Sequence, residues 1–282
     1  MRLGVLDGRA VVVRGDRAAD VSRSSEGRLP DDPTALLERW RQVREWEAEL
    51  PDEAYDLTLD PSALGAPVPR PRQVFAVALN YPPHAAEAGY TPPAEPLVFT
   101  KFPACITGPH TTVALPQGKV DWEVELVAVI GRETYRASED RAWESVAGLT
   151  VGQDLSERVS QLRGKPAQFS LGKSFPGFGP TGPVLVTPDE FEDPDDLEIT
   201  GLLNGTAVQH DRTKSMIFPV PELVARLSAV LPLFPGDLIF TGTPAGVGNR
   251  MDPPRYLTAD DELVSRVEGI GEIRQHFTAA QP

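Results

Sequence analysis

Residues 121–131 read DWEVELVAVIG, an acidic start followed by an uninterrupted apolar run. Side chains alternate between the two faces of a β-strand, so Asp121, Glu123 and Glu125 are predicted to share one face. That face continues with valines toward a core, where like charges repel and burial raises their cost. A divalent cation would remove both penalties, and Mg²⁺ or Mn²⁺ prefers carboxylate oxygens. The alternative is an ordinary amphipathic strand whose acids face solvent.

Asp154, in the segment VGQDLSER, is the candidate for a third carboxylate ligand. It follows an apolar run and precedes Ser156, Arg158 and Gln161, whose polar groups suit the binding of an anion. The alternative is that Asp154 or Ser156 caps a helix. Spacing alone leaves both interpretations open.

His84 and Glu87 are spaced i, i+3 and would be neighbours on one helical turn. A carboxylate beside an imidazole fixes the tautomer of the ring and raises its pKa, which suits a general base that activates water. The alternative is a surface pair without a chemical role.

Lys101 and Lys173 lie in the apolar contexts VFTKF and SLGKSF, unlike solvated lysines. A partly buried lysine near a metal could polarise a keto oxygen or hold a carboxylate. The alternative is that each lysine caps a strand end or pairs with an acid.

The loop TGTPAGVG at residues 241–248 directly follows the apolar segment DLIF. Glycine-rich loops can offer backbone N–H groups to anions. No Gly-Lys-Ser/Thr follows, and the loop does not open a helix, so it matches neither common nucleotide-binding motif. Two interpretations of this loop remain: it binds a carboxylate, or it is only a tight turn.

The composition excludes several classes of protein. The chain has 282 residues, enough for about two domains, with 27 basic and 41 acidic residues and a net charge of −14. This charge disfavours nucleic acid and anionic membranes as partners. Cys105 is the single cysteine, so an intrachain disulfide and a cysteine-rich metal site are excluded. No apolar run predicts a transmembrane helix and the start does not resemble a signal peptide, so a cytoplasmic location is expected.

The patterns along the chain predict a β-rich α+β fold. A small N-terminal unit (residues 1–68) contains a hairpin over 1–17, turning at Asp7-Gly8, and a helix over 33–49. The proline-rich stretch at 64–73 predicts an extended link to a main domain (residues 69–282). In that domain we expect strands at 74–80, 183–188, 198–204 and 237–241, a short helix at 84–88, a helix-like segment at 142–154, and a helix within 216–231 starting near Pro221.

Seven segments, taken together and in order over about residues 74–276, resemble the fumarylacetoacetate hydrolase family. They are ALNYPPHAAEAG, PLVFTKFPACITGP, DWEVELVAVIG, GLTVGQDLSERVSQ, FSLGKSFPGFGPTGP, LNGTAVQHDRTKSMIF and LPLFPGDLIFTGTPAGVG. The layout is similar to bacterial members that carry a short N-terminal domain. One variation is Pro82-Pro83 ahead of His84, which would stiffen a segment that acts as a mobile lid in several members.

The resemblance implies a fold, a cofactor and a set of site residues. The fold would be a mixed β-sandwich or β-roll, and the assembly a homodimer. The metal would be Mg²⁺ or Mn²⁺, with Ca²⁺ in some members. The implied metal ligands are Glu123, Glu125 and Asp154; the implied catalytic residues are His84, Glu87 and Lys173; and the implied substrate contacts are Arg158, Gln161 and Thr243, to which the apolar context adds Lys101.

Family substrates share a 2-oxo acid, or its enol, next to a second carbonyl or carboxylate. We therefore expect a small 2-oxo or diketo acid as substrate and metal-dependent hydrolysis of a C–C bond in an acylpyruvate-like β-diketo acid, since a cation can stabilise the enolate left behind. Oxaloacetate-type decarboxylation and 2-hydroxymuconate-type isomerisation or tautomerisation need the same parts and are the alternatives. A catalytically inactive metal-dependent binding protein is the non-enzyme alternative.

Overall fold

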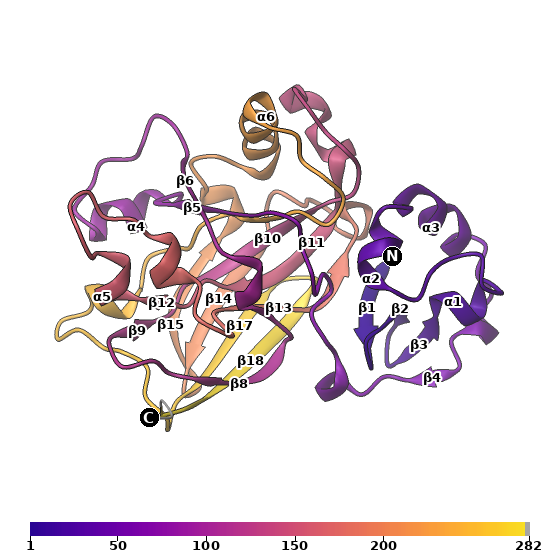
Figure 1. Ribbon diagram of the computed structural model, residues 1–282, viewed down its shortest axis with the longest axis horizontal. Helices are drawn as coiled ribbons and strands as arrows, with labels where there is room; N and C mark the ends of the chain where they lie inside the picture. Colours follow the sequence, from indigo (N-terminus) through magenta and orange to yellow (C-terminus); the bar gives the residue numbers. More distant parts are fainter. Residues whose placement is uncertain (280–282) are drawn as a thin grey trace.

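Two β-sheets form the centre of the computed structural model, which describes residues 1–279 (Figure 1). The larger sheet has eleven strands in the order β4-β3-β2-β1-β13-β11-β10-β16-β5-β6, with β7 paired to β13. The second sheet has the order β15-β14-β17-β18-β8, and β9 and β12 form a separate pair. The predicted β-rich α+β class is confirmed. A search of residues 1–279 finds no helix that is long and apolar enough to cross a membrane.

The elements have the following bounds. The strands are β1 (Arg2–Leu6), β2 (Arg9–Arg14), β3 (Arg17–Asp20), β4 (Leu57–Thr58), β5 (Val74–Ala78), β6 (Leu97–Thr100), β7 (Ile106–Thr107), β8 (His110–Ala114), β9 (Val120–Asp121), β10 (Val124–Ile130), β11 (Val146–Gln153), β12 (Ser156–Glu157), β13 (Gly179–Val186), β14 (Glu198–Leu203), β15 (Thr206–Arg212), β16 (Leu238–Phe240), β17 (Glu262–Val267) and β18 (Gly271–Thr278). The α-helices are α1 (Val21–Ser24), α2 (Pro33–Leu37), α3 (Trp40–Glu47), α4 (Pro82–Glu87), α5 (Arg158–Gln161) and α6 (Val220–Val230). The 3₁₀-helices are η1 (Asp52–Ala54), η2 (Pro61–Ala63), η3 (Pro103–Cys105), η4 (Glu139–Ser145), η5 (Ser170–Lys173), η6 (Pro188–Glu190), η7 (Thr213–Ser215) and η8 (Gly248–Arg250).

The N-terminal strands extend the large sheet. β1 pairs antiparallel with both β2 and β13, and the indigo segment lies at one end of the molecule in Figure 1. The predicted hairpin is confirmed: Asp7 and Gly8 have φ values of 50° and 79°, and both positive angles are what a type I′ turn requires. The single helix predicted over 33–49 is wrong. It is two helices, because Arg39 leaves the helical conformation (φ −112°, ψ 24°) between α2 and α3.

β10 is buried on both faces and separates two parts of the core. Its even-numbered residues pack in the cluster that contains Ile199 of β14 and Ile273 of β18, so this cluster joins the two sheets. Val127 and Val129 belong to the cluster that contains Leu36 and Leu37 of α2. The predicted alternation along this segment therefore holds from residue 124 onward, and both faces end in apolar packing.

The helix-like pattern predicted over residues 142–154 is wrong. Residues 146–153 form β11, which lies between β10 and β13 and is buried at every position. A strand that is covered on both faces shows no two-residue alternation, so its apolar run is easily mistaken for a helix. β5, β13, β14 and β16 overlap the other predicted strands, and α6 starts at Val220, next to the predicted Pro221.

We expect Leu149→Ala in β11 to lower the free energy of unfolding by about 2–5 kcal/mol, because the fully buried side chain would leave a cavity in the core. Leu171→Ala is the matched control, since Leu171 is 72% exposed and should change stability by at most about 0.5 kcal/mol. Denaturant unfolding of the two variants measures the difference. Equal effects would contradict the placement of β11 in the core.

Candidate active site

Three carboxylates converge where β9, β10 and β11 meet. Glu123 lies in the two-residue break between β9 and β10, Glu125 lies on β10, and Asp154 directly follows β11. The backbone N–H of Asp154 donates to the Glu123 carbonyl at 2.9 Å, which holds the two segments together. One oxygen from each of the three side chains lies within 4.8 Å of the others, and all three residues are buried.

The surroundings shift the pKa values of the two glutamates of this triad in opposite directions. Burial, Asp154 and Glu123 together raise the pKa of Glu125 well above its usual range. Burial would also raise the pKa of Glu123, but the nearby cations Lys173 and Arg158 outweigh it and lower that pKa to about 2. Glu123 is thus held in its ionised form, whereas ionisation of Glu125 is unfavourable. The site would therefore be stabilised by additional positive charge. The donor set, three carboxylates with one oxygen each within 4.8 Å of the others, fits Mg²⁺ or Mn²⁺.

Two lysines contact the triad from η5 and from the end of β6. Lys173 Nζ donates to Glu123 Oε2 at 2.7 Å and to Asp154 Oδ2 at 2.6 Å. Lys101 Nζ donates to Asp154 Oδ1 at 2.6 Å and to the Lys173 carbonyl oxygen. Lys101 is completely buried and is not among the residues that line the pocket. In this structure Lys101 contacts Asp154 and the Lys173 backbone, and the substrate-contact role expected for it stays a prediction.

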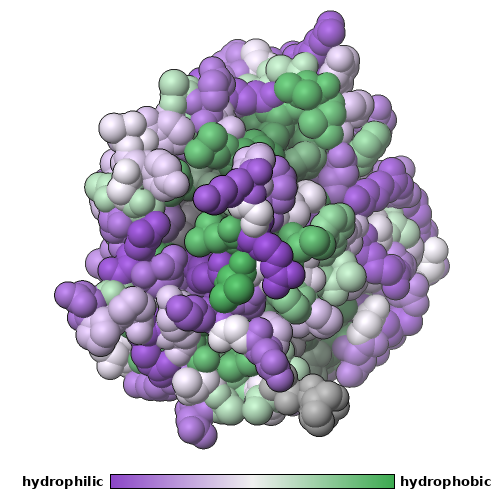
Figure 2. Space-filling view, turned by 60° about the vertical axis from the view of Figure 1, so that its left-hand side comes forward, coloured by the Kyte–Doolittle hydropathy of each residue, from purple (hydrophilic) through white to green (hydrophobic). Residues whose placement is uncertain are grey.

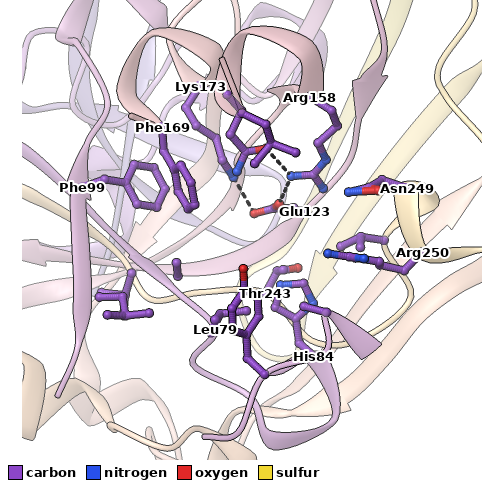
Figure 3. Close-up of a pocket in the computed structure, with 18 residues that line it drawn as sticks. Leu79, His84, Phe99, Glu123, Arg158, Phe169, Lys173, Thr243, Asn249 and Arg250 are labelled. Carbon is purple, nitrogen blue, oxygen red and sulfur yellow. Dashed lines mark hydrogen bonds and ion pairs between the residues drawn. The ribbon is translucent and has the colours of Figure 1, made fainter. Parts of the chain in front are cut away.

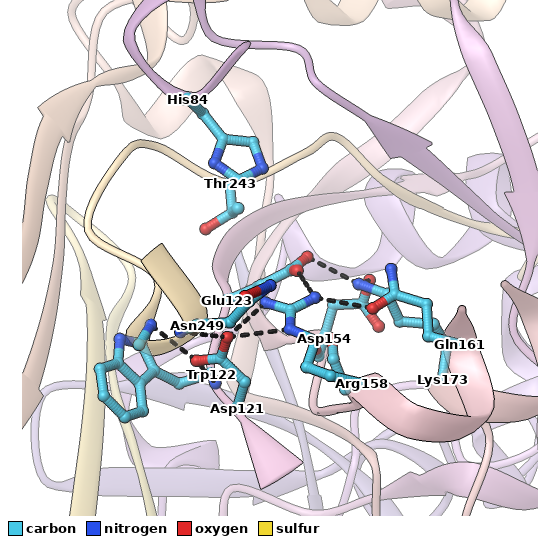
Figure 4. Close-up of polar contacts among 12 residues, drawn as sticks. His84, Asp121, Trp122, Glu123, Asp154, Arg158, Gln161, Lys173, Thr243 and Asn249 are labelled. Atoms are coloured by element: carbon cyan, nitrogen blue, oxygen red, sulfur yellow. Dashed lines mark hydrogen bonds and ion pairs between the residues drawn. The ribbon is translucent and has the colours of Figure 1, made fainter. Parts of the chain in front are cut away.

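Asp121 is separated from the triad although it was predicted to share a strand face with it. Its carboxylate accepts from Arg158 Nε at 2.9 Å and Nη2 at 2.6 Å, and from the backbone N–H groups of Gly248 and Asn249 (Figure 4). Arg158 also donates through Nη1 to Glu123 Oε1 at 2.7 Å and to Gln161 Oε1 at 2.9 Å. Asp121 thus fixes Arg158, and Arg158 fixes one oxygen of Glu123.

The predicted His84–Glu87 pair is formed on α4. His84 Nδ1 lies 2.7 Å from Glu87 Oε1, and Glu87 Oε2 accepts the Gly246 N–H at 3.0 Å. A carboxylate that binds Nδ1–H leaves Nε2 as the proton acceptor of the ring. Gly246 belongs to the 241–248 loop, so Glu87 ties the helix that carries His84 to that loop.

The same loop is fastened to the strand that carries the acids. Thr243 Oγ1 donates to the Val124 carbonyl at 2.9 Å, and the Gly242 N–H donates to Glu125 Oε2 at 2.8 Å. Gly242 has φ 99°, and a Cβ there would lie 2.7 Å from Asn80 Cβ, so a side chain would displace the loop. Of the two interpretations of this loop, backbone donation to a carboxylate is present, toward the protein's own Glu125.

A pocket of about 250 Å³ brings most of these residues together. Glu123 and Lys173 lie on one side of it in Figure 3, and His84 and Thr243 lie on the opposite side. Arg158 and Gln161 line it as well, whereas Glu87, Glu125 and Asp154 lie behind the lining.

Sequence reasoning missed twelve further lining residues, among them Leu79, Phe99, Phe169, Asn249 and Arg250. Their residue types are ordinary and they lie in separate loops and strand ends, so no spacing signal marks them. Arg250 is exposed, and within residues 1–279 its guanidinium makes no ion pair. That leaves a free cation at the pocket of a strongly acidic protein.

Comparison with known proteins identifies the family. The model of the fumarylacetoacetate (FAA) hydrolase C-terminal domain matches residues 73–278. The chain belongs to the fumarylacetoacetate hydrolase family. The fold is accordingly the fold of that family, as the resemblance implied.

Relatives in the fumarylacetoacetate hydrolase family carry out different reactions. A Mycobacterium smegmatis crystal structure, provisionally described as an HpcE protein, is 52% identical with a TM-score of 0.93, and each chain covers 100% of the other. Human oxaloacetate tautomerase FAHD2A is 43% identical over 210 residues, which are 74% of this chain and 67% of the relative. Maleylpyruvate hydrolase from Sphingobium, solved with manganese(II) and pyruvate, is 29% identical with a TM-score of 0.82 and full coverage of both chains. Hydrolase and tautomerase activities both occur among these relatives.

Proposed function

We propose that the protein is a metal-dependent hydrolase that cleaves a carbon–carbon bond in an acylpyruvate-like β-diketo acid. The observation that carries the proposal is the position of the His84–Glu87 dyad, whose imidazole lies across one pocket from Glu123 of the acidic triad (Figures 3 and 4). A base on one side and charge-stabilising groups on the other suit the addition of water to a substrate held between them.

The acidic side of the pocket is proposed to bind the pyruvate part of the substrate. Glu123, Glu125 and Asp154 would hold Mg²⁺ or Mn²⁺, which when bound supplies a Lewis acid that polarises the 2-oxo group and favours an enolate. Lys173 places an ammonium group beside the triad, and the free guanidinium of Arg250 suits the substrate carboxylate.

The His84 side is proposed to activate water. Glu87 holds Nδ1–H, and Nε2 takes a proton from water. The hydroxide forms a bond to the distal carbonyl carbon, and the bond from that carbon to the methylene carbon breaks. The electron pair stays with the methylene carbon as the pyruvate enolate, which receives the proton from His84. The products are one carboxylic acid and pyruvate, and one water molecule is consumed.

A second candidate function is keto–enol tautomerisation of oxaloacetate. The human relative of that name, 43% identical, favours it. His84 could move a proton between carbon and oxygen without any attack by water, so the same dyad would serve both reactions.

Turnover assays separate the two functions. Purified protein is incubated with acetylpyruvate and with oxaloacetate, each with Mg²⁺, with Mn²⁺ and with EDTA, while enol absorbance and product masses are followed. We expect metal-dependent formation of acetate and pyruvate. Accelerated enol–keto exchange of oxaloacetate, with acetylpyruvate left intact, would replace the hydrolase by the tautomerase. Acetylpyruvate cleavage that EDTA does not reduce would contradict the assigned metal site.

A further inference from the structure

The pocket has an apolar part around Phe99 and Phe169, which we call the lobe. Tyr90, Leu97, Phe99 and Phe169 are among the apolar residues that line the pocket, and Lys173 is the charged lining residue next to Phe99. In Figure 3 Phe99 and Phe169 lie to one side of Glu123, and Asn249 and Arg250 lie to the other. The lining of the pocket therefore changes from aromatic on one side of Glu123 to polar on the other.

Two aromatic rings form the wall of the lobe. Phe99 of β6 and Phe169 of the loop before η5 meet edge to face, with ring centroids 5.8 Å apart and planes at 68°. Both side chains are partly exposed to the pocket rather than buried in the core. Aromatic rings favour edge-to-face or offset-stacked packing, so a ring on the ligand would find favourable partners in Phe99 and Phe169.

The aromatic wall begins directly at the charged centre. Lys173 Nζ lies 5.2 Å from the Phe99 ring centroid and also donates to Glu123. A ligand whose anionic end lies beside Lys173 would consequently place its next few atoms against Phe99 and Phe169.

Leu79 is another apolar residue of the pocket lining and lies near Thr243 in Figure 3. It follows β5 in the left-handed conformation (φ 58°), which costs an L-residue other than glycine about 1–2 kcal/mol. Backbone strain of this kind concentrates at functional sites, where the surrounding structure enforces it. In this pocket the residue with the strained backbone is a leucine of the lining.

The lobe is open to solvent at its outer end. Tyr90 is 62% exposed and Leu97 is 47% exposed, and other apolar side chains of the same face, such as Leu162, are exposed as well. Figure 2, which brings this side of the molecule forward, shows apolar residues among hydrophilic ones on its surface. A group larger than methyl could extend along the lobe and remove this surface from water.

We infer that the lobe binds the distal group of the substrate and that this group is uncharged and apolar, with an aromatic ring preferred. The inference rests on the proposed function, which places the pyruvate end at the acidic triad. The charged group nearest the Phe99 ring, Lys173, already pairs with Glu123 and Asp154. A distal carboxylate would therefore give up hydration in the lobe without a free cation to bind, which is unfavourable.

The test uses 2-oxo acids that have no second keto group, so binding is measured without turnover. Isothermal titration calorimetry of the Mn²⁺-loaded protein compares 2-oxo-4-phenylbutanoate, 2-oxopentanoate and 2-oxoglutarate. The last two have five carbons each and differ at the distal end. We expect the phenyl compound to bind at least about tenfold tighter than 2-oxopentanoate, and 2-oxoglutarate to bind more weakly than either. Equal or tighter binding of 2-oxoglutarate would overturn the inference.

Phe169→Ala should reduce the advantage of the phenyl compound over 2-oxopentanoate by about tenfold. Leu171→Ala is the matched control, because Leu171 lies two residues away, is exposed and does not line the pocket. A melting curve of each variant confirms folding, and an unchanged phenyl advantage in folded Phe169→Ala would refute the assignment. These measurements test the lobe independently of the proposed reaction. Acetylpyruvate left uncleaved would refute the hydrolase, whereas the order of affinities shows whether the lobe binds an apolar distal group.

Discussion

Replacing Glu125 by glutamine is expected to abolish metal-dependent turnover and, at the same time, to stabilise the metal-free protein. Glu125 is fully buried near two other carboxylates, and burial raises its pKa well above the usual range. The uncharged amide removes that repulsion and also removes one oxygen ligand. We expect activity to fall by at least about 100-fold, the scale seen when one charge-stabilising group is lost.

The stabilisation should depend on pH with a defined sign. An unfolded glutamate ionises near pH 4.3. Glu125 keeps its proton to higher pH in the folded protein. The free-energy cost of ionising its buried carboxyl group is therefore absent below about pH 4.3 and grows as the pH rises. In EDTA, the melting temperature of Glu125→Gln should therefore exceed that of the wild type by more at pH 7 than at pH 5.

With Mn²⁺ added, the wild type should become more stable than Glu125→Gln. A cation that binds only the folded state adds about 2.7 kcal/mol at 100 times its Kd, and the variant should gain far less. Glu198→Gln, an exposed change on β14, is the control and should melt like the wild type. If Glu125→Gln bound Mn²⁺ as tightly as the wild type, Glu125 could not be a ligand.

His84→Ala should reduce acylpyruvate hydrolysis by about 100- to 10,000-fold, the usual contribution of a positioned general base. Its affinity for Mn²⁺ should be nearly unchanged, because the ring bonds Glu87 and none of the three carboxylates of the triad. Stopped assays of pyruvate formation and Mn²⁺ titrations measure the two effects.

The same variant distinguishes reaction types. Loss of CO₂ from oxaloacetate needs no activated water, so any decarboxylation should survive His84→Ala. The control is His210→Ala, since His210 is exposed on β15. Full hydrolytic activity in His84→Ala would remove the dyad from the mechanism.

The sequence was sufficient to predict the acidic triad but not the exclusion of Asp121 from it. The strand breaks after Asp121 because the N–H groups of Glu123 and Val124 donate to side-chain oxygens of Gln153 and Gln209. Gln209 is 85 residues away in sequence from Val124. A break that depends on such a distant partner leaves no local pattern.

Other differences have similar causes. Lys101 and Lys173 share an apolar sequence context, yet only Lys173 reaches the pocket, because Lys101 lies behind Asp154. β11 lacks alternation since both of its faces are covered. The aromatic wall of Phe99 and Phe169 arises only when β6 and the loop before η5 come together.

The separate origin of that wall has a consequence for how this enzyme could diversify. The acids come from β10, from the break just before it and from the residue after β11, whereas Phe99 and Phe169 come from β6 and a loop. Changes in the wall can therefore alter which acyl group is accepted while the groups proposed for chemistry stay fixed. Such a division makes the scaffold modular, so a small library at positions 79, 99 and 169 is a natural starting point for redirecting its selectivity.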